Sequence, residues 1–258
     1  MTVRLEAISM SPPIGGKPHR LFQGLDIDIP SGGRIGILGL PRSGKTTLLN
    51  IIAGTETSFT GNRYCDGRCS WIIPYDGFIA NTAPMAWSIR FLGRLYGVRD
   101  NGFARRVGKI AAAGEFVNQR ATAIPGYVRQ QIAFAVGIAM DFDVYLFDNM
   151  AVPQRGDYRE IGKEFLASET AGKTIVVATN SPPQVTTNCE SAYVLEDGRA
   201  IWFADVNEAA KYFKEMTKAE EERQKQLEQQ GVTEDDLAED SVAGPTDVDM
   251  IGAAISSL

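Results

Sequence analysis

Residues 34–53 read Arg34-Ile35-Gly36-Ile37-Leu38-Gly39-Leu40-Pro41-Arg42-Ser43-Gly44-Lys45-Thr46-Thr47-Leu48-Leu49-Asn50-Ile51-Ile52-Ala53. The first part is an apolar run that predicts a buried strand, and the part from Thr47 to Ala53 has the apolar spacing of a helix. Between them, Gly39 to Thr46 match the pattern G-x-x-x-x-G-K-[ST]. A strand, a glycine-rich loop and a helix in this order predict a P-loop.

A P-loop binds nucleotide phosphates because backbone N–H groups and a helix N-terminus surround them, while glycines allow close approach. We expect Lys45 to reach the β- and γ-phosphates and the Thr46 hydroxyl to hold Mg²⁺, so ATP with Mg²⁺ is the predicted cofactor. The alternative is a glycine and serine loop that joins a strand to a helix by chance. The predicted nucleotide-binding residues are Gly39, Leu40, Pro41, Arg42, Ser43, Gly44, Lys45, Thr46 and Thr47.

Length and composition set the frame around this motif. The chain has 258 residues, of which 44% are hydrophobic, enough to bury the core of one large domain or two subdomains. No run of about 18 apolar residues is present, and the sequence from Met1 does not begin a signal peptide, so we expect a cytoplasmic protein. Cys65, Cys69 and Cys189 lack the spacing of a zinc or redox site and are expected to be reduced thiols.

The charge is divided unevenly along the chain. Twelve acidic and three basic residues lie from Glu215 onward, so this tail carries −9, and residues 1–214 carry +3 of the total of −6. Thr233 to Asp249 is acidic and poor in aromatic residues, and we expect it to be disordered. The basic residues form no stripe with interleaved aromatic residues, so nucleic acid is not an expected partner.

Two kinds of sequence pattern occur along the chain, one typical of strands and one typical of helices. Val3 to Ile8 and Leu25 to Ile29 alternate like strands, Ser11 to Pro18 is expected to be a loop, and Gly54 to Gly67 is rich in turn residues. Short apolar runs predict further strands, whereas Pro84 to Met140 has helical spacing, with Trp87, Phe91 and Leu95 on one stripe. We therefore predict an α/β P-loop NTPase core with a mostly parallel sheet and an inserted helical subdomain. The predicted division is 1–215 for the nucleotide-binding domain, with the insertion at about 80–142, and 216–258 for a charged helix and tail. The additional strands are predicted at Ser70–Ile73, Val144–Phe147, Thr174–Ala178, Ala192–Leu195 and Ala200–Phe203, and a helix at Val206–Met216.

Asp148 follows an apolar strand about a hundred residues after the P-loop, as expected of a Walker B aspartate that reaches Mg²⁺. The alternative is an aspartate that caps a turn. With a helical insertion between the two motifs, residues 3 to 215 resemble the nucleotide-binding subunits of ATP-binding cassette (ABC) transporters, and within them the capsular polysaccharide export branch. The resemblance is carried by Ser58–Gly61, Cys69–Trp71, Ile89–Gly97, Ile132–Ala135, Phe142–Asp148 and Val194–Arg199.

The sequence departs from the family at its catalytic positions. The resemblance implies a glutamate after the Walker B aspartate and a histidine after a late strand, but these positions hold Asn149 and Asn180. An asparagine can orient water but cannot take its proton. The family's Leu-Ser-Gly-Gly-Gln signature aligns with Ile124, Pro125, Gly126, Tyr127 and Val128, which lack the serine hydroxyl and the second glycine.

Three further positions depart from the family. Arg155 stands where the family has an aspartate, and Pro41 and Arg42 stand where it usually has asparagine and glycine. No aromatic residue lies near Met10 or Pro12 to stack on adenine. Together these departures indicate a degenerate cassette that binds ATP and hydrolyses it poorly or not at all.

The resemblance implies two protein partners. One is a transmembrane permease that holds the subunit at the cytoplasmic face of the inner membrane, and the other is a second nucleotide-binding subunit, either this chain or an intact paralogue. Phe78 and Trp87 are the predicted anchors for the permease, because buried aromatic side chains dominate such contacts; the alternative is that both pack inside the insertion. Two other functions remain open: a regulatory protein that binds nucleotide without hydrolysing it, and a P-loop kinase.

Overall fold

A computed structural model describes residues 3–14, 17–18, 20–149 and 158–229. Residues up to Phe213 form one compact unit, and residues from Lys214 onward form a second, of which the described part is helical. None of the helices in these described ranges has both the length and the apolar character needed to cross a membrane.

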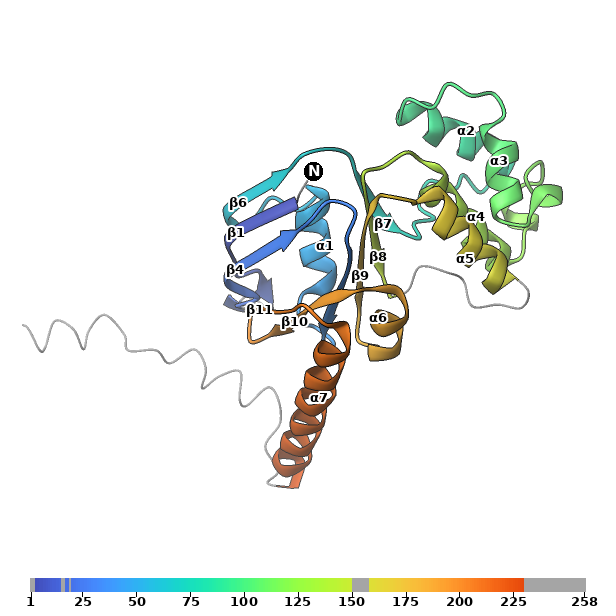
Figure 1. Ribbon diagram of the computed structural model, residues 1–258. Coiled ribbons are helices and arrows are strands. Elements are labelled where there is room, and N and C mark those ends of the chain that lie inside the picture. Colours follow the sequence, from blue (N-terminus) through green and yellow to red (C-terminus); the bar gives the residue numbers. More distant parts are fainter. Residues whose placement is uncertain (1–2, 15–16, 19, 150–157, 230–258) are drawn as a thin grey trace, which may run out of the picture. The chain divides into compact units, whose positions relative to one another are not determined.

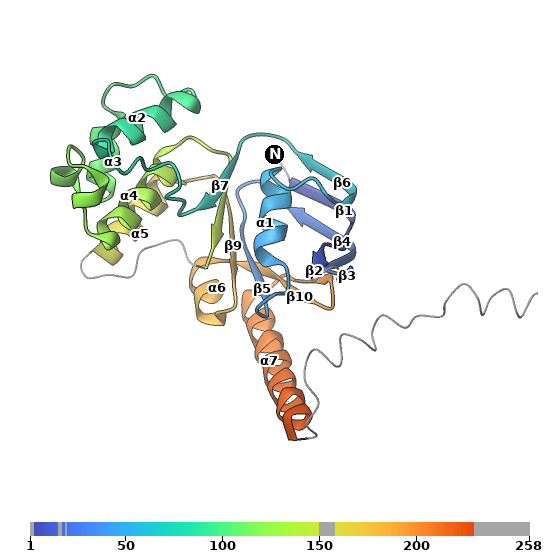
Figure 2. The same ribbon diagram turned by 180° about the vertical axis from the view of Figure 1, so that it is seen from behind.

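A six-stranded sheet forms the centre of the first unit, in the order β11-β10-β5-β9-β8-β7 (Figures 1 and 2). The strands from β10 to β7 run parallel to their neighbours, and β11 pairs antiparallel with β10. This arrangement confirms the predicted α/β class with a mostly parallel sheet. The strands are β5 (Arg34–Gly39), β7 (Cys69–Ile73), β8 (Val144–Asp148), β9 (Thr174–Thr179), β10 (Ser191–Glu196) and β11 (Arg199–Phe203).

Helices cover both faces of this sheet. On one face, α1 (Lys45–Ala53) packs Leu48 and its neighbours against the apolar side chains of β5, including Ile37. Side chains alternate along a strand, so Gly36 faces the other side, where α6 (Pro182–Asn188) places Val185 close to it. Since both faces are covered, β8 and β9 are apolar almost throughout, as is typical of buried parallel strands.

A second, antiparallel sheet covers the other side of α1, in the order β4-β1-β6. Its strands are β1 (Val3–Met10), β4 (Phe22–Ile29) and β6 (Thr60–Cys65). The expectation of turns from Gly54 to Gly67 was incomplete, because this region contains β6. The expectation of a loop from Ser11 to Pro18 was also wrong in part, because β2 (Pro13–Ile14) and β3 (Lys17–Pro18) form a short antiparallel ribbon.

Between β7 and β8 the chain forms α2 (Met85–Leu95), α3 (Phe103–Ile110) and α4 (Gly126–Ala139), with 3₁₀ turns at Gly114–Phe116 and Ala121–Ala123. A further helix, α5 (Tyr158–Glu169), follows β8 and packs against α3 and α4, and Arg106 of α3 pairs with Glu169 at its end. Figure 1 shows these four helices grouped beyond the β7 edge of the main sheet. The helices α2, α3 and α4 form the predicted inserted helical subdomain, whereas α5 lies after its predicted end at about residue 142.

The last described helix, α7, spans Val206–Gln229 and therefore extends past the predicted end at Met216. Its first turns belong to the first unit and bury Val206, Ala209 and Phe213. The predicted acidic, disordered tail from Thr233 to Asp249 lies outside the described residues.

Candidate functional site: a P-loop at the carboxyl edge of the parallel sheet

The loop between β5 and α1 has the conformation that its glycines permit. Gly44 is the N-cap of α1 with φ of 89°, a left-handed conformation that an L side chain adopts only with strain. A Cβ atom on Gly44 would lie 2.8 Å from Cζ of Phe22, and one on Gly39 would lie 2.3 Å from Oγ of Ser43. Both positions therefore have no room for a side chain, because Phe22 and Ser43 already lie there.

Lys45 is the first residue of α1, and its side chain folds over the loop. Nζ donates hydrogen bonds to the carbonyl oxygens of Gly39, at 2.8 Å, and Leu40, at 2.7 Å. Burial lowers the pKa of Lys45, and the negative charge of Asp148 acts in the opposite direction. The ammonium group is therefore held close to the loop and to the Asp148 carboxylate.

Thr46 and Asp148 meet although 102 positions separate them in the chain. The Thr46 hydroxyl donates to Oδ2 of Asp148 at 2.5 Å, and Nδ2 of Asn149 donates to Oδ1 of the same carboxylate at 3.2 Å. A hydroxyl and a carboxylate oxygen are hard ligands of the kind that Mg²⁺ prefers, and Mg²⁺ in phosphate sites takes its remaining ligands from water and phosphate. The pair expected from the two sequence motifs is therefore adjacent in the fold.

These residues fit a nucleotide phosphate with Mg²⁺. The Ser43 hydroxyl is buried and has no hydrogen-bond partner among the described residues, so it can serve a bound group. The loop ends at the N-terminus of α1, where backbone N–H groups attract phosphate, Lys45 supplies a positive charge, and Thr46 with Asp148 supplies oxygen ligands.

The parallel sheet explains why distant residues gather here. Leu38 of β5 lies opposite Thr179 of β9, and Ala178 of β9 lies opposite Asp148 of β8. The carboxyl ends of the three strands therefore share one edge, where ligands bind in open α/β sheets. Asn149 and Asn180 follow β8 and β9 at this edge, and both are exposed.

Comparison with known proteins shows which solved structures share this architecture. No protein-family model matches the chain. The dimeric structure of MJ0796, a bacterial ABC transporter cassette, superposes with a TM-score of 0.65 at 20% identity and covers 77% of this chain and 96% of MJ0796. A post-hydrolysis state of MJ0796 bound to ADP and phosphate gives a TM-score of 0.63 at 21% identity, with the same coverage. The chain has the fold of an ATP-binding cassette.

Its sequence relatives include ATP-binding proteins of polysaccharide export. The ATP-binding protein BexA of Haemophilus influenzae is 25% identical over 77% of this chain and 91% of BexA. The capsule polysaccharide export ATP-binding protein CtrD of Neisseria meningitidis is 24% identical over 74% of this chain and 89% of CtrD. The polysialic acid transport ATP-binding protein KpsT of Escherichia coli is 24% identical over 83% of this chain and all of KpsT.

The stretch that aligns with the family signature begins α4 of the cassette, where it was predicted to lie. Pro125 is the N-cap of the helix, and its carbonyl oxygen accepts from the N–H of Val128 at 3.0 Å. Ile124 and Val128 are buried, whereas Tyr127 is 40% exposed. The position predicted to correspond to a glycine of the family signature thus presents an aromatic ring. Arg155, the remaining departure, lies outside the described residues.

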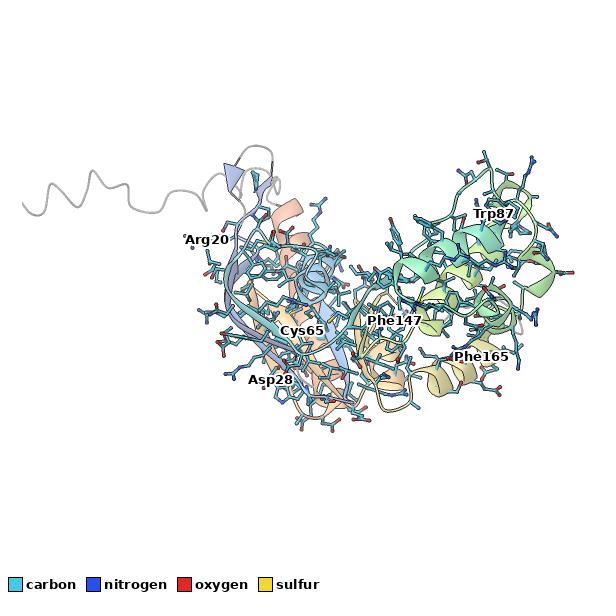
Figure 3. All side chains as sticks on the ribbon, turned by 90° about the horizontal axis from the view of Figure 1, so that it is seen from above. Arg20, Asp28, Cys65, Trp87, Phe147 and Phe165 are labelled. Atoms are coloured by element: carbon cyan, nitrogen blue, oxygen red, sulfur yellow. The ribbon has the colours of Figure 1, made fainter. Side chains whose placement is uncertain are left out.

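The predicted permease anchors lie in and beside α2 of the cassette. Trp87 is 66% exposed, so it does not pack inside the insertion, and Figure 3 shows its side chain at the outer edge of the helical subdomain, remote from Phe147. Phe78 is half-buried in the loop before α2, which is tied to the helix by a hydrogen bond from the N–H of Ala80 to Oγ of Ser88.

One residue beside the P-loop of the cassette was missed in the sequence. The N–H of Leu21 donates to the carbonyl of Met10 at 2.9 Å, and the Leu21 side chain borders Gly44. Leu21 is half-buried, while the neighbouring aromatic residue, Phe22, is buried in the core. Leu21 therefore presents a partly exposed apolar side chain beside Gly44 of the P-loop. The pairing of β1 with β4, which places Met10 opposite Phe22, was the signal that could have identified Leu21.

Substitution of Gly44 tests the loop geometry. Gly44→Ala should lower the free energy of unfolding by about 1–2 kcal/mol, because alanine is strained in the left-handed region and its Cβ would press on Phe22. Thermal unfolding should then occur roughly 2–8 °C below the wild type. Gly114→Ala is the control, since a Cβ there meets nothing within 4 Å. Equal unfolding temperatures for the two variants would contradict the described loop.

Proposed function

We propose that this chain is the ATP-binding subunit of an ABC transporter that exports a capsular or other cell-surface polysaccharide, held at the cytoplasmic face of the inner membrane by a transmembrane permease. One observation carries the proposal. The chain spans nearly the full length of CtrD and KpsT, whose names state polysaccharide export or transport, and it retains a P-loop with Thr46 beside Asp148.

In this proposal, different residues of the chain bind different parts of the nucleotide. The loop from Gly39 to Gly44 surrounds the phosphates, Lys45 neutralises their charge, and Thr46 with Asp148 holds Mg²⁺, which would offset the negative charge on the β- and γ-phosphates. Leu21 contacts the base. The dimer seen for MJ0796 supports pairing with a second nucleotide-binding subunit, whether a second copy of this chain or an intact paralogue.

Hydrolysis is the step for which the residues are poorly suited. The side chain beside Asp148 is the amide of Asn149, which donates to Asp148 and has no basic atom that could take a proton from water. Asn180 likewise offers an amide at the neighbouring strand end. We therefore infer that the chain binds ATP with weak or no turnover of its own.

The proposal predicts a contact with a membrane partner through Phe78 and Trp87. When the chain is expressed with its permease, it should co-purify from detergent extracts with a protein of several membrane spans, and Phe78→Asp or Trp87→Asp should abolish this. A charge placed in an aromatic anchor leaves a desolvated, unpaired group at the interface. ATP affinity should be unchanged.

Tyr64→Asp is the matched control, because Tyr64 is an aromatic residue with 52% exposure on β6, a strand of the antiparallel sheet and not part of the helical subdomain that contains Trp87. Co-purification should survive this change. If it also survives Phe78→Asp and Trp87→Asp, the docking role of these residues is wrong. If the wild type purifies alone, without a membrane partner, the regulatory alternative is favoured over the transporter subunit.

A further inference from the structure

Two of the three cysteines touch where the chain passes from one sheet to the other. Cys65 is the last residue of β6 and Cys69 is the first residue of β7, and their Sγ atoms lie 3.1 Å apart. Both thiols are free and half-buried. Spacing in the sequence did not indicate this contact, because three residues separate the two cysteines where a metal or redox pair usually has two.

The two sulfur atoms belong to different sheets. Cys65 lies opposite Val3 of β1 at an edge of the antiparallel sheet, and Cys69 lies opposite Val144 of β8 at an edge of the main sheet. A turn of three residues joins the cysteines, and Gly67 in this turn has φ of 124°, a value that L side chains rarely adopt. The turn therefore brings the ends of two strands so close that their side chains meet.

The surroundings of the pair do not form a metal site. In the part of the chain that the structure describes, no group of three or more His, Cys, Asp or Glu side chains is placed to hold a metal ion. A structural zinc ion takes four such ligands, so two cysteines alone are not enough. The chemistry that remains for two adjacent thiols is the formation of a disulfide.

We propose that Cys65 and Cys69 form a reversible disulfide within the chain when a peroxide oxidises it. A disulfide bond is about 2.05 Å long, so the two sulfur atoms need to approach each other by only about 1 Å. Disulfides in proteins of reducing compartments are usually transient, and a dithiol reductant would restore both thiols here. The site is thus a point of redox modification in a chain that is otherwise expected to be reduced.

The reaction has two steps. In the first, a thiol sulfur attacks hydrogen peroxide, the O–O bond breaks, one oxygen leaves as water, and the sulfur becomes a sulfenic acid. In the second, the other thiol forms the S–S bond, and the sulfenic oxygen leaves as water with the thiol proton. Burial raises the pKa of Cys69 to about 12, so this group supplies its proton to the departing water. Two thiols are oxidised and one peroxide is reduced to two waters.

The cysteine pair is remote from the nucleotide site. Arg63 contacts Cys69, and its guanidinium donates to the carbonyl oxygen of Ile52 in the last turn of α1, at 2.6 Å. The P-loop meets α1 at the opposite end, at Lys45. Figure 3 shows Cys65 in the part of the molecule that contains the two sheets, apart from Trp87 of the helical subdomain. Oxidation should therefore leave the affinity for Mg-ATP unchanged, and a fall in affinity would contradict this separation.

The test treats the folded full chain with hydrogen peroxide, removes the peroxide with catalase, and alkylates the remaining thiols after unfolding. Mass spectrometry of the intact chain should show one alkylated cysteine, where the untreated chain shows three. Trypsin cleaves after Arg68, so the disulfide should join two separate peptides, one with Cys65 and one with Cys69. Treatment with dithiothreitol before alkylation should restore three alkylated cysteines.

Cys189 is the internal control, because it is buried and follows α6 on the other face of the main sheet from α1. Loss of thiol at Cys65 and Cys69 should be at least about tenfold faster than at Cys189, since a neighbouring thiol closes the bond within the chain. Cys189→Ser should show two alkylated cysteines before oxidation and none after it.

Cys65→Ser and Cys69→Ser are the matched variants, because each removes one sulfur of the pair. Neither should form a disulfide within the chain. Three intact thiols at a peroxide dose that oxidises the unfolded chain would overturn the proposal. So would a disulfide that joins Cys189 or two chains, or oxidation of Cys65 to a sulfinic acid while Cys69 stays a thiol.

Discussion

Lys45→Ala is expected to abolish binding of Mg-ATP, with a loss of affinity of at least about 100-fold. Lys45 is the cation that the fold holds over the P-loop, where its ammonium group donates to the carbonyls of Gly39 and Leu40. Hydrogen bonds between charged groups are the strong ones, and their loss in a partly buried site leaves phosphate charge uncompensated. Titration calorimetry measures the effect directly.

Lys211→Ala is the matched control, because Lys211 is an exposed lysine on α7 of the same compact unit. It should bind Mg-ATP like the wild type. The same ATP affinity for Lys45→Ala and the wild type would show that nucleotide does not bind at this loop.

Asn149→Glu is expected to remain nearly inactive in ATP hydrolysis, although it restores a carboxylate beside Asp148. Loss of a general base typically costs about 10²–10⁴ in rate, and loss of a preorganised donor about 10²–10³. The rate losses from removing groups that act together are not additive, so restoring one of these groups recovers little of the rate. Asn180 and Tyr127 are still present at the positions for which the sequence resemblance implies a histidine and a glycine.

The structure gives a second reason to expect low activity from Asn149→Glu. Asn149 has φ of 53°, in the left-handed region that asparagine adopts readily and glutamate does not. A glutamate here should therefore cost about 1–2 kcal/mol or leave this conformation. Phosphate release should rise clearly only in Asn149→Glu with Asn180→His and Tyr127→Gly, and Lys45→Ala should remove that rise. Full activity of Asn149→Glu alone would contradict the expectation that all three substitutions are needed.

The P-loop and the strand that ends at Asp148 could be predicted from sequence because both depend on local patterns. A strand, a glycine loop and a helix follow one another in residues 34–53, and a buried parallel strand needs an uninterrupted apolar run. The meeting of Thr46 with Asp148 then follows from the parallel sheet, since β5, β9 and β8 end at one edge.

The missed elements depend on distant partners. β6 contains exposed residues and no apolar alternation, and it is a strand because β1 pairs with it, as Val3 does with Cys65. For α2, the sequence analysis identified one apolar stripe, formed by Trp87, Phe91 and Leu95. The structure buries Met85, Ile89 and Leu92 and leaves the stripe of Trp87, Phe91 and Leu95 exposed, a choice that tertiary packing makes.

The central claim is that this chain binds ATP through an intact P-loop and does not consume it alone. The most direct measurement is to incubate the purified chain with labelled ATP and Mg²⁺, recover the bound nucleotide, and determine how much has become ADP. The account predicts bound ATP that stays intact, at a conversion rate equal to that of Lys45→Ala or of buffer. Steady conversion to ADP by the unmodified chain, lost in Lys45→Ala, would show that other residues replace the missing catalytic groups and would contradict the account.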